Sequence, residues 1–504
     1  MLRPRSAMNR YVVAVLRKPA LLPIAVMLSL TLPHLGQGDF VVDTGWYAAI
    51  GLQAWRDAIS GRPGALWTLM AEGGQGGLAY FNKPPLAFWV HGFALWAMGP
   101  SVLAARLPAV IAGAACVWLT VSIAGVLHTR RTGFLAGLIL ALTIEFTRHT
   151  RAFSLDVWQL LFLLAAARVA AGAVRRGSMR ALPIGGVFVG LALLTKPLVG
   201  LVGWSLLMIW AWLPGVGRRG EHRRGFGWAF VGLIVAALIA SPWHIGMVIE
   251  HGTAFTSRYF GHEIAARAMG TIDRANTGAA NPLYYTQELV RHYLPWLISV
   301  LLGLVAWARG GLRRDAGMAL IVVWTLTWFV ILSAFADKRP RYLLPVFPFW
   351  AWLSAVWIRD QAPRWLALVR RAVVRWVGVF AIGGGMLVAA LPVTIDRSMD
   401  PNWAGFMEFL RTAEMADEAW WQGGFEGARG ARLYLEFGRW PLSTRDRSGV
   451  LIATPPRDAV ILYHRRDGLV PGEGERTLYE NADFRVTRLQ TEQWAPSSRP
   501  DPGE

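Results

Sequence analysis

Long apolar stretches separated by short polar turns dominate the first 394 residues of the chain. A transmembrane helix needs about 20 mostly apolar residues, because each residue adds about 1.5 Å across a hydrocarbon layer of about 30 Å. We therefore predict a multi-pass α-helical membrane protein with about 11 to 13 transmembrane helices. The predicted spans are 21–36, 103–126, 133–148, 154–174, 182–196, 198–214, 226–248, 292–308, 317–335, 342–358 and 372–394.

One further apolar stretch, 85–99, is short, and we interpret it as interfacial or re-entrant. With that assignment the basic segments of the chain all fall on one side of the membrane. They hold 22 Arg and Lys residues against three acids, which is typical of cytoplasmic loops. If 85–99 spanned the membrane, the later basic loops would change sides. The basic segments are the N-terminus, 128–131, 175–180, 218–224, 309–315 and 359–375.

The opposite, outer side then holds two long loops, 37–102 and 249–291, together with the C-terminal tail. We interpret the basic N-terminus and the first apolar run as a retained helix that enters from the cytoplasm, not as a cleaved signal peptide. The expected location is the cytoplasmic (inner) membrane, with the outer loops and the tail on the periplasmic or extracellular side.

The tail from residue 395 onward is polar and rich in Gly, Pro, Glu and Arg. We predict two domains, a transmembrane domain of residues 1–394 and a small soluble α/β domain of residues 395–504 with a disordered end. The patterns that predict the second domain are strands at 432–437, 459–464 and 484–489 and a helix at 403–417.

Composition supports the membrane assignment and excludes some other classes of protein. Hydrophobic residues make up 54% of the chain and charged residues 16%, against about 25% charged in ordinary globular proteins. The net charge of +19 does not indicate nucleic-acid binding, because the basic residues cluster in the loops. The single cysteine, Cys116, cannot form a disulfide within the chain. The sequence contains no nucleotide-binding motif.

Lysine is rare: it occurs only at positions 18, 83, 196 and 338, and arginine supplies the other basic charges. Three of these four lysines lie on the predicted outer side, against the positive-inside trend. Lysine is a compact point charge that suits a phosphate. Cations that converge on one cavity indicate an anionic group such as phosphate or pyrophosphate, although binding of lipid headgroups as an anchor is an alternative.

Two carboxylates on the same side are candidates for catalysis. Asp43 directly follows the first helix, where it can act as a base or, as the more common alternative, cap a helix. Asp156 stands at the outer mouth of a predicted span, and acids near membrane depth are costly and often functional. Asp156 can serve the site or a structural ion pair.

The second long loop contains an amphipathic segment, 254–269. We expect Phe255, Tyr259 and Phe260 to face lipid while Glu263 and Arg267 point into a cavity. The chain has no HExxH motif and no cysteine cluster, so we expect no metal or other cofactor.

Taken together, the motifs resemble those of GT-C glycosyltransferases, in the group of protein O-mannosyltransferases and aminoarabinose (lipid A) transferases. The resemblance covers about residues 20–360. It departs from the family pattern at Thr44 and Asn82, where members often have Glu. The motifs are, in order, Asp43, KPPL from Lys83, RLPA from Arg106, Arg151 to Asp156, LLTKP ending at Pro197, PWHI from Pro242, HGxxF from His251 and YLLPVFP from Tyr342.

The resemblance implies that the chain transfers a sugar, with inversion, from a polyprenyl-phosphate donor such as undecaprenyl phosphate to lipid A, another glycan or a secreted protein. Membrane lipids and the donor are the expected partners. It implies Asp43 and Asp156 as catalytic residues and a phosphate-binding set of Lys83, Arg267, Lys338 and Arg341. It further implies a substrate cavity lined by Tyr47, Lys196, Arg258, Tyr259, Glu263 and Tyr342.

Two other functions fit parts of the pattern. A flippase or transporter of lipid-linked saccharides would explain the lysines but not the two outer carboxylates beside them. An inactive scaffold would explain Thr44 in place of Glu.

Overall fold

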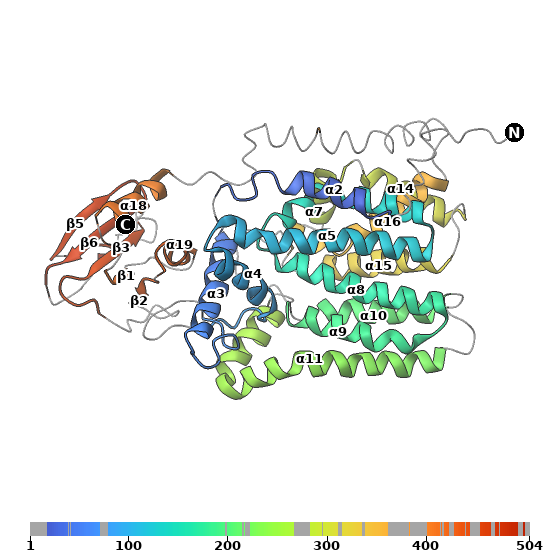
Figure 1. The fold of residues 1–504 in the computed structure, drawn as a ribbon, viewed down its shortest axis with the longest axis horizontal. Helices are drawn as coiled ribbons and strands as arrows, with labels where there is room; N and C mark the ends of the chain where they lie inside the picture. The colour runs from blue at the N-terminus through green and yellow to red at the C-terminus, as the bar shows by residue number, and fades with distance from the viewer. Residues whose placement is uncertain are drawn as a thin grey trace. The chain divides into compact units, whose positions relative to one another are not determined.

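The structure of the protein is a computed structural model (Figure 1). It describes residues 18–38, 40, 42–70, 79–196, 199–213, 216, 222–266, 283–294, 296–310, 315–334, 338–360, 383, 401–413, 415, 418–422, 428–438, 440–443, 454–464, 469–472, 474–491 and 497–498.

The chain divides into two compact units that interleave in the sequence. The first unit contains residues 1–35, 81–87 and 106–392, and the second contains residues 36–80, 88–105 and 393–504. The predicted domain boundary near residue 394 stays a prediction. The second unit nevertheless includes most of the first long loop, which the sequence pattern assigns to the membrane domain.

The first unit is helical. Its long helices α8, α9, α10 and α11 lie side by side (Figure 1). Its core is filled by large side chains such as Trp204, Trp210, Trp324 and Trp352. The helices are α2 (Leu21–Thr31), α5 (Val102–Leu127), α6 (Arg130–Ala141), α7 (Ile144–Thr150), α8 (Leu155–Arg176), η1 (Met179–Ala181), α9 (Leu182–Leu193), α10 (Val199–Trp212), α11 (His222–Thr256), η2 (Ser257–Ala266), α13 (Tyr284–His292), α14 (Trp296–Ala308), α15 (Ala316–Ala334), η3 (Pro340–Leu343) and α16 (Phe347–Asp360).

The predicted spans correspond to these helices, with two differences. The predicted span 133–148 is two helices, α6 and α7, because Thr143 leaves the helical conformation and bonds the carbonyl of Ile139 with its hydroxyl. The predicted span 372–394 falls almost wholly outside the described residues. Among the helices that the structure describes, four are long and apolar enough to cross a membrane, or five if the bent pair α13 and α14 forms one span.

Glycines let two helices of the first unit touch along their backbones. A Cβ atom at Gly186 of α9 would lie 2.0 Å from the carbonyl oxygen of Gly232 of α11. Small residues at such crossings are the usual means by which membrane helices approach closely. The close contact of Gly186 with Gly232 therefore fixes the position of α9 against α11.

Helix α11 carries a break that re-aims the segment after it. Gly252 has φ +51° and ψ −126°, a conformation that disfavours residues with a Cβ atom. The chain continues as the π-helix η2. The prediction that Phe255 and Tyr259 face lipid is wrong, because both are buried against Trp243. Only Phe260 of the three is exposed.

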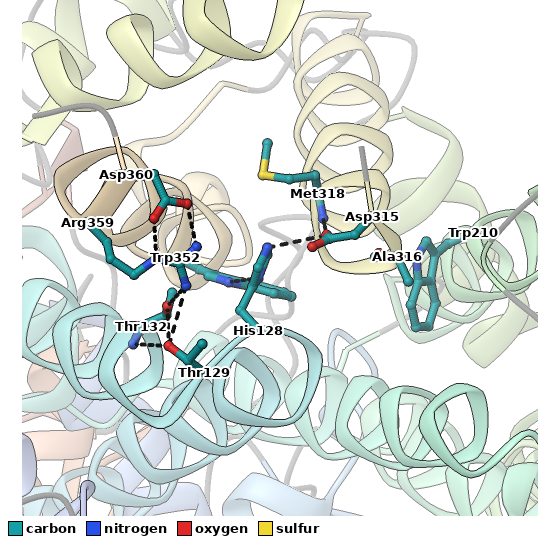
Figure 2. A network of polar contacts seen from close by, with 10 residues as sticks. All are labelled: His128, Thr129, Thr132, Trp210, Asp315, Ala316, Met318, Trp352, Arg359 and Asp360. Atoms are coloured by element: carbon teal, nitrogen blue, oxygen red, sulfur yellow. Dashed lines mark hydrogen bonds and ion pairs between the residues drawn. The ribbon is translucent and has the colours of Figure 1, made fainter. Parts of the chain in front are cut away.

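A polar network joins the ends of four helices in the first unit (Figure 2). The His128 Nε2 atom lies 3.3 Å from the Asp315 carboxylate, and the Asp315 carboxylate also accepts a hydrogen bond from the backbone of Met318 in α15. The Trp352 indole of α16 donates to the His128 Nδ1 atom over 2.8 Å. Arg359 at the end of α16 donates to the hydroxyl of Thr132 in α6 over 2.6 Å.

The network fixes the proton position on His128. An indole N–H can only donate, so the Nδ1 atom of His128 must accept, and the ring proton lies on Nε2, facing Asp315. Burial by itself raises the pKa of the Asp315 carboxyl, but the hydrogen bonds from His128 and Met318 outweigh it and hold that pKa below its usual value. These contacts involve basic segments that the sequence pattern places on the cytoplasmic side.

The second unit begins with helices α3 (Val42–Ile59) and α4 (Leu86–Met98). The two helices cross where a Cβ atom at Gly92 would lie 2.2 Å from the oxygen of Gly51. Helix α4 has 13 residues, which is about 20 Å of helix and shorter than a hydrocarbon layer. The Tyr47 ring packs edge-on against Phe88 of α4.

The C-terminal part of the second unit is an α/β domain with a five-stranded sheet in the order β2-β1-β3-β6-β5. Strands β2, β1 and β3 are parallel, whereas β6 pairs antiparallel with both β3 and β5. Helices α18 and α19 share one core with the sheet. The elements are α18 (Pro401–Thr412), β1 (Trp420–Gln422), α19 (Ala428–Phe437), β2 (Leu442–Ser443), β3 (Val460–His464), β5 (Glu475–Glu480) and β6 (Phe484–Leu489), with a separate pair β4 (Leu469–Val470) and β7 (Ser497–Ser498).

The strands predicted at 459–464 and 484–489 are confirmed as β3 and β6, and the helix predicted at 403–417 is found as α18, which ends earlier, at Thr412. The predicted strand at 432–437 is wrong, because these residues belong to the helix α19. The helix is apolar on two sides, since Leu433 faces the sheet core while Tyr434 lies against Arg56 of α3. Burial on two sides hides the helical period in the sequence.

Candidate functional site

The turn Lys83-Pro84-Pro85 places a buried cation at the start of α4. The two prolines lack backbone donors and fix the chain, so Lys83 has little freedom. Its ammonium forms an ion pair with the carboxylate of Glu263 in η2, and the side chain of Glu263 is 1% exposed. Lys83 and Glu263, which are far apart in the sequence, are thus neighbours in the fold, in the segment η2 that follows α11.

The same segment of η2 supplies a second cation beside this turn. The Arg258 Nε atom donates to the side-chain oxygen of Asn82 over 2.8 Å. Asn82 therefore has a role here as an acceptor, in the position where family members often have Glu. Tyr259 is the residue after Arg258. Its hydroxyl lies 3.0 Å from the His244 Nε2 atom, and its ring packs against Trp243 in a buried aromatic cluster.

A second group of ions lies where α9 ends. Ser154 caps α8 and so sets Asp156 in its first turn. The Asp156 carboxylate forms an ion pair with Lys196, and its other oxygen lies 3.9 Å from the Arg341 Nε atom. The Lys196 ammonium stands 5.1 Å from the centre of the Tyr342 ring, within cation–π range.

The two groups adjoin through the backbone. The amide of Leu86, three residues after Lys83, donates to the carbonyl of Leu194, two residues before Lys196, over 3.0 Å. Among the described side chains named in the two groups, each group has two cations and one carboxylate, so these side chains leave one positive charge in each group when all are ionised. The pair of turns therefore forms a partly buried region with an excess of positive charge.

Two arginines that belong to the sequence motifs, Arg106 and Arg151, bind backbone carbonyls. The Arg151 guanidinium donates to the backbone carbonyls of Thr31 and Pro33, and Arg106 donates to that of Leu35. Thr31 is the last residue of α2, and Pro33 and Leu35 lie in the turn after it, where backbone carbonyls need partners from outside the helix. Both arginines therefore hold the point at which the chain leaves α2.

Two residues near Asp156 were not among the sequence-predicted site residues. Glu145 is 2% exposed, and His149 lies 3.0 Å from its carboxylate, one helical turn away. His149 interacts electrostatically with Asp156, and His292 does so with Glu145. The signal available in the sequence was the Glu-x-x-x-His spacing, which places both side chains on one helix face.

The remaining predicted residues stand as follows. Lys338 is buried in the first unit. Tyr47 belongs to the second unit. Asp43 lies in the first turn of α3, but its side chain is outside the described part of the structure, as is the whole of Arg267. Their functional roles stay predictions, and so does the absence of a metal. Within the described ranges no three His, Cys, Asp or Glu side chains group closely enough to hold an ion.

The chain is similar in sequence and in fold to known proteins. Residues 82–245 match the family described as dolichyl-phosphate-mannose-protein mannosyltransferase. The matched segment begins at the Lys83 turn and includes the Asp156 and Lys196 motifs, so the family resemblance predicted from the sequence is confirmed.

Curated relatives belong to the same group. The chain is 26% identical over 282 residues to the undecaprenyl phosphate-alpha-4-amino-4-deoxy-L-arabinose arabinosyl transferase of Erwinia tasmaniensis, covering 54% of this chain and 48% of that protein. It is 28% identical over 279 residues to the enzyme of the same name from Pseudomonas aeruginosa strain UCBPP-PA14, covering 53% and 48%. The chain thus spans about half the length of the curated relatives it matches.

Solved structures show that the fold is shared over nearly the whole chain. ArnT from Cupriavidus metallidurans bound to undecaprenyl phosphate superposes with a TM-score of 0.64 at 20% identity, over 95% of this chain and 98% of that one. The archaeal oligosaccharyltransferase AglB from Archaeoglobus fulgidus gives a TM-score of 0.58 at 14% identity, over 90% and 66%. The predicted GT-C architecture with a small C-terminal α/β domain is therefore confirmed, whereas the number of spans is not.

Proposed function

We propose that the protein is a glycosyltransferase that takes a sugar from a polyprenyl-phosphate donor and transfers it, with inversion, to a lipid, glycan or secreted protein at the outer face of the cytoplasmic membrane. The observation that carries this proposal is the excess of positive charge at the two adjoining turns of Lys83 and Lys196. Relatives named for undecaprenyl phosphate-linked 4-amino-4-deoxy-L-arabinose support a lipid-linked donor.

The charge of the site suits the leaving group. A sugar phosphodiester carries one negative charge, and the phosphate gains a second as its bond to the sugar breaks. Two surplus positive charges therefore match the departing phosphate better than the intact donor, which is the condition for stabilising the transition state. In this mechanism Lys83, Arg258 and Arg341 stabilise the phosphate, and Arg267 and Lys338 are further candidates.

The acceptor oxygen attacks the anomeric carbon from the face opposite the phosphate. The new C–O bond forms as the bond to the phosphate oxygen breaks, and the electron pair leaves with the phosphate. Asp43 takes the proton of the acceptor hydroxyl, a step typically worth about 10²–10⁴-fold in rate. Asp156, held by Lys196, orients the sugar or offsets the positive charge that develops on it.

Binding of undecaprenyl phosphate to Lys83→Gln tests the phosphate site. A charge-assisted hydrogen bond contributes about 1.5–3 kcal/mol, so we expect the Kd for this lipid to rise by at least about tenfold. Lys18→Gln, which changes a lysine of the basic N-terminal segment, is the matched control and should bind like the wild type. Thermal unfolding of each variant establishes that it is folded. An unchanged Kd for folded Lys83→Gln would contradict the proposed phosphate site.

A further inference from the structure

Lys83 and Glu263 form an ion pair that is almost closed to water. The side chain of Lys83 is 10% exposed and that of Glu263 is 1% exposed. Pro84 and Pro85 fix the backbone beside the lysine, so its ammonium has little freedom to move. A second anion at this ammonium would stand beside a carboxylate of the same charge where little water screens the repulsion. An anion that binds Lys83 therefore competes with Glu263.

Glu263 belongs to a segment whose backbone departs from the ordinary α-helix. Gly252 takes a positive φ shortly before it, and Ser257–Ala266 then form the π-helix η2. A π-helical backbone is rare and occurs frequently at functional sites. The first half of η2 is held by the buried Tyr259, which bonds His244 of α11, whereas Glu263 lies in the second half. A change of partner at Glu263 therefore leaves the attachment of η2 to α11 intact.

The two oxygens of the Glu263 carboxylate face different bases. The Oε2 atom is bound by the Lys83 ammonium, while the Oε1 atom lies 3.7 Å from the Nδ1 atom of His262. The His262 side chain is 34% exposed, so it can take up a proton from water. A small rotation of the Glu263 side chain then brings its carboxylate onto the imidazolium. Release of Lys83 therefore does not leave Glu263 buried without a cation, which would be strongly destabilising.

A phosphate can make contacts at this turn that a single carboxylate does not make. Ammonium and guanidinium groups both form charge-assisted hydrogen bonds with phosphate oxygens. Arg258 stands beside the Lys83 turn, where its Nε atom donates to Asn82. A guanidinium has five N–H donors, and this bond uses one of them. A phosphate with several anionic oxygens can therefore contact Lys83 and Arg258 together.

We infer that Glu263 competes with the donor phosphate for the Lys83 ammonium, and that donor binding exchanges one anion for the other as the carboxylate turns to His262. Because Lys83 is taken as the phosphate ligand, this exchange rests on the proposed function. Glu263 then has a role other than lining the substrate cavity, since it sets how tightly the lipid phosphate is held. The polyprenyl phosphate left after transfer carries more negative charge than the donor, and the returning carboxylate promotes its release.

Binding of undecaprenyl phosphate to the full-length protein in detergent tests the exchange. In Glu263→Gln an amide of the same shape replaces the carboxylate, so Lys83 no longer has to be freed before the lipid binds. We expect the Kd to fall by at least about tenfold, because the binding-competent fraction of the protein rises. General damage to the site would raise the Kd, so the direction of the change separates the exchange from a structural role.

Two controls separate the exchange from a change in overall charge. Glu288→Gln also removes a buried acid of the first unit, one that pairs with Arg291, and it should bind the lipid with the Kd of the wild type. In the Lys83→Gln background, Glu263→Gln should change the Kd by less than about twofold, because no ammonium is left for the two anions to share.

The variant Glu263→Asp keeps the charge on a shorter side chain, and it carries the test if Glu263→Gln does not fold. Its weaker contact with Lys83 should give a Kd below that of the wild type and above that of Glu263→Gln. Thermal unfolding of each variant establishes that it is folded.

An unchanged or higher Kd in folded Glu263→Gln, with the wild type binding the lipid, would overturn the exchange and leave the proposed phosphate site intact. Equal tightening by Glu263→Gln in the Lys83→Gln background would overturn it as well. If neither the wild type nor Glu263→Gln binds the lipid, the phosphate site itself is wrong, and the exchange is wrong with it.

Discussion

The lysines at the centre of the proposed site are paired with carboxylates. Lys83 is bound to Glu263 and Lys196 to Asp156. The scarcity of lysine in the sequence singled out both cations as site candidates. Asp156 was a candidate because it stands at the mouth of a predicted span, and Glu263 because it belongs to the amphipathic segment 254–269. The sequence did not predict which carboxylate pairs with which lysine, because Lys83 and Glu263 are 180 residues apart and only the tertiary fold brings them together.

The same limit explains the residues that were missed at this scale. The spacing of Glu145 and His149 places both side chains on one helix face, but nothing in the sequence places that face beside Asp156. Conversely, Arg151 is part of a motif, but in the structure it bonds the carbonyls at the end of α2. A motif position alone does not separate a residue that contacts substrate from one that holds the backbone.

Asp315 gives a prediction about pH and stability. Its pKa lies below the usual value because of the bonds from His128 and Met318, against the opposing effect of burial. A lowered pKa in the folded protein means stability that is present above the unfolded value, about 3.9, and is lost as pH falls through the folded one. We expect Asp315→Asn to flatten the fall of the unfolding temperature below about pH 4.

The control for this experiment is Glu408→Gln, which removes an exposed acid of α18. It should leave the pH dependence of the unfolding temperature as in the wild type. An equally steep fall for Asp315→Asn would contradict the assignment of this stability to the network in Figure 2.

At the scale of elements, apolar length predicts most helices, and breaks within them are harder to see. The interruption between α6 and α7 depends on one hydroxyl, that of Thr143, bonding backward to a carbonyl. Helix α19 was predicted as a strand because it is apolar toward both the sheet and α3. In each case the sequence pattern was compatible with two local structures, and packing selected one of them.

The contact of α9 with α11 gives a prediction about helix packing. The substitution Gly186→Ala places a methyl group against the backbone oxygen of Gly232, which no rotamer change can relieve. Overpacking of this kind costs about 1–3 kcal/mol, so we expect a clearly lower unfolding temperature in detergent.

Gly227→Ala is the matched control, because a Cβ atom at this exposed position of α11 meets nothing within 4 Å. It should unfold at the temperature of the wild type or slightly above, since alanine favours helix over glycine. Equal unfolding temperatures for the two variants would contradict the close contact at Gly186.

At the scale of the whole molecule, the first outer loop and the C-terminal domain form one compact unit, although more than 300 residues separate them in the chain. Composition correctly indicates a membrane region and a polar tail. It does not indicate that residues 36–80 fold with the tail, because that association depends on non-local packing such as α19 against α3. The proposed catalytic base and the C-terminal domain therefore belong to the same unit.

The measurement that tests the central claim most directly is transfer from radiolabelled polyprenyl-phosphate sugars in membranes containing the wild type or Asp43→Asn. We predict a labelled product with the wild type, whose identity names the acceptor, and a loss of at least about 100-fold with Asp43→Asn while donor binding survives. Full turnover by Asp43→Asn would contradict the base assignment. Absence of transfer by the wild type with every donor, together with labelled lipid moving between leaflets, would contradict the transferase and favour a flippase.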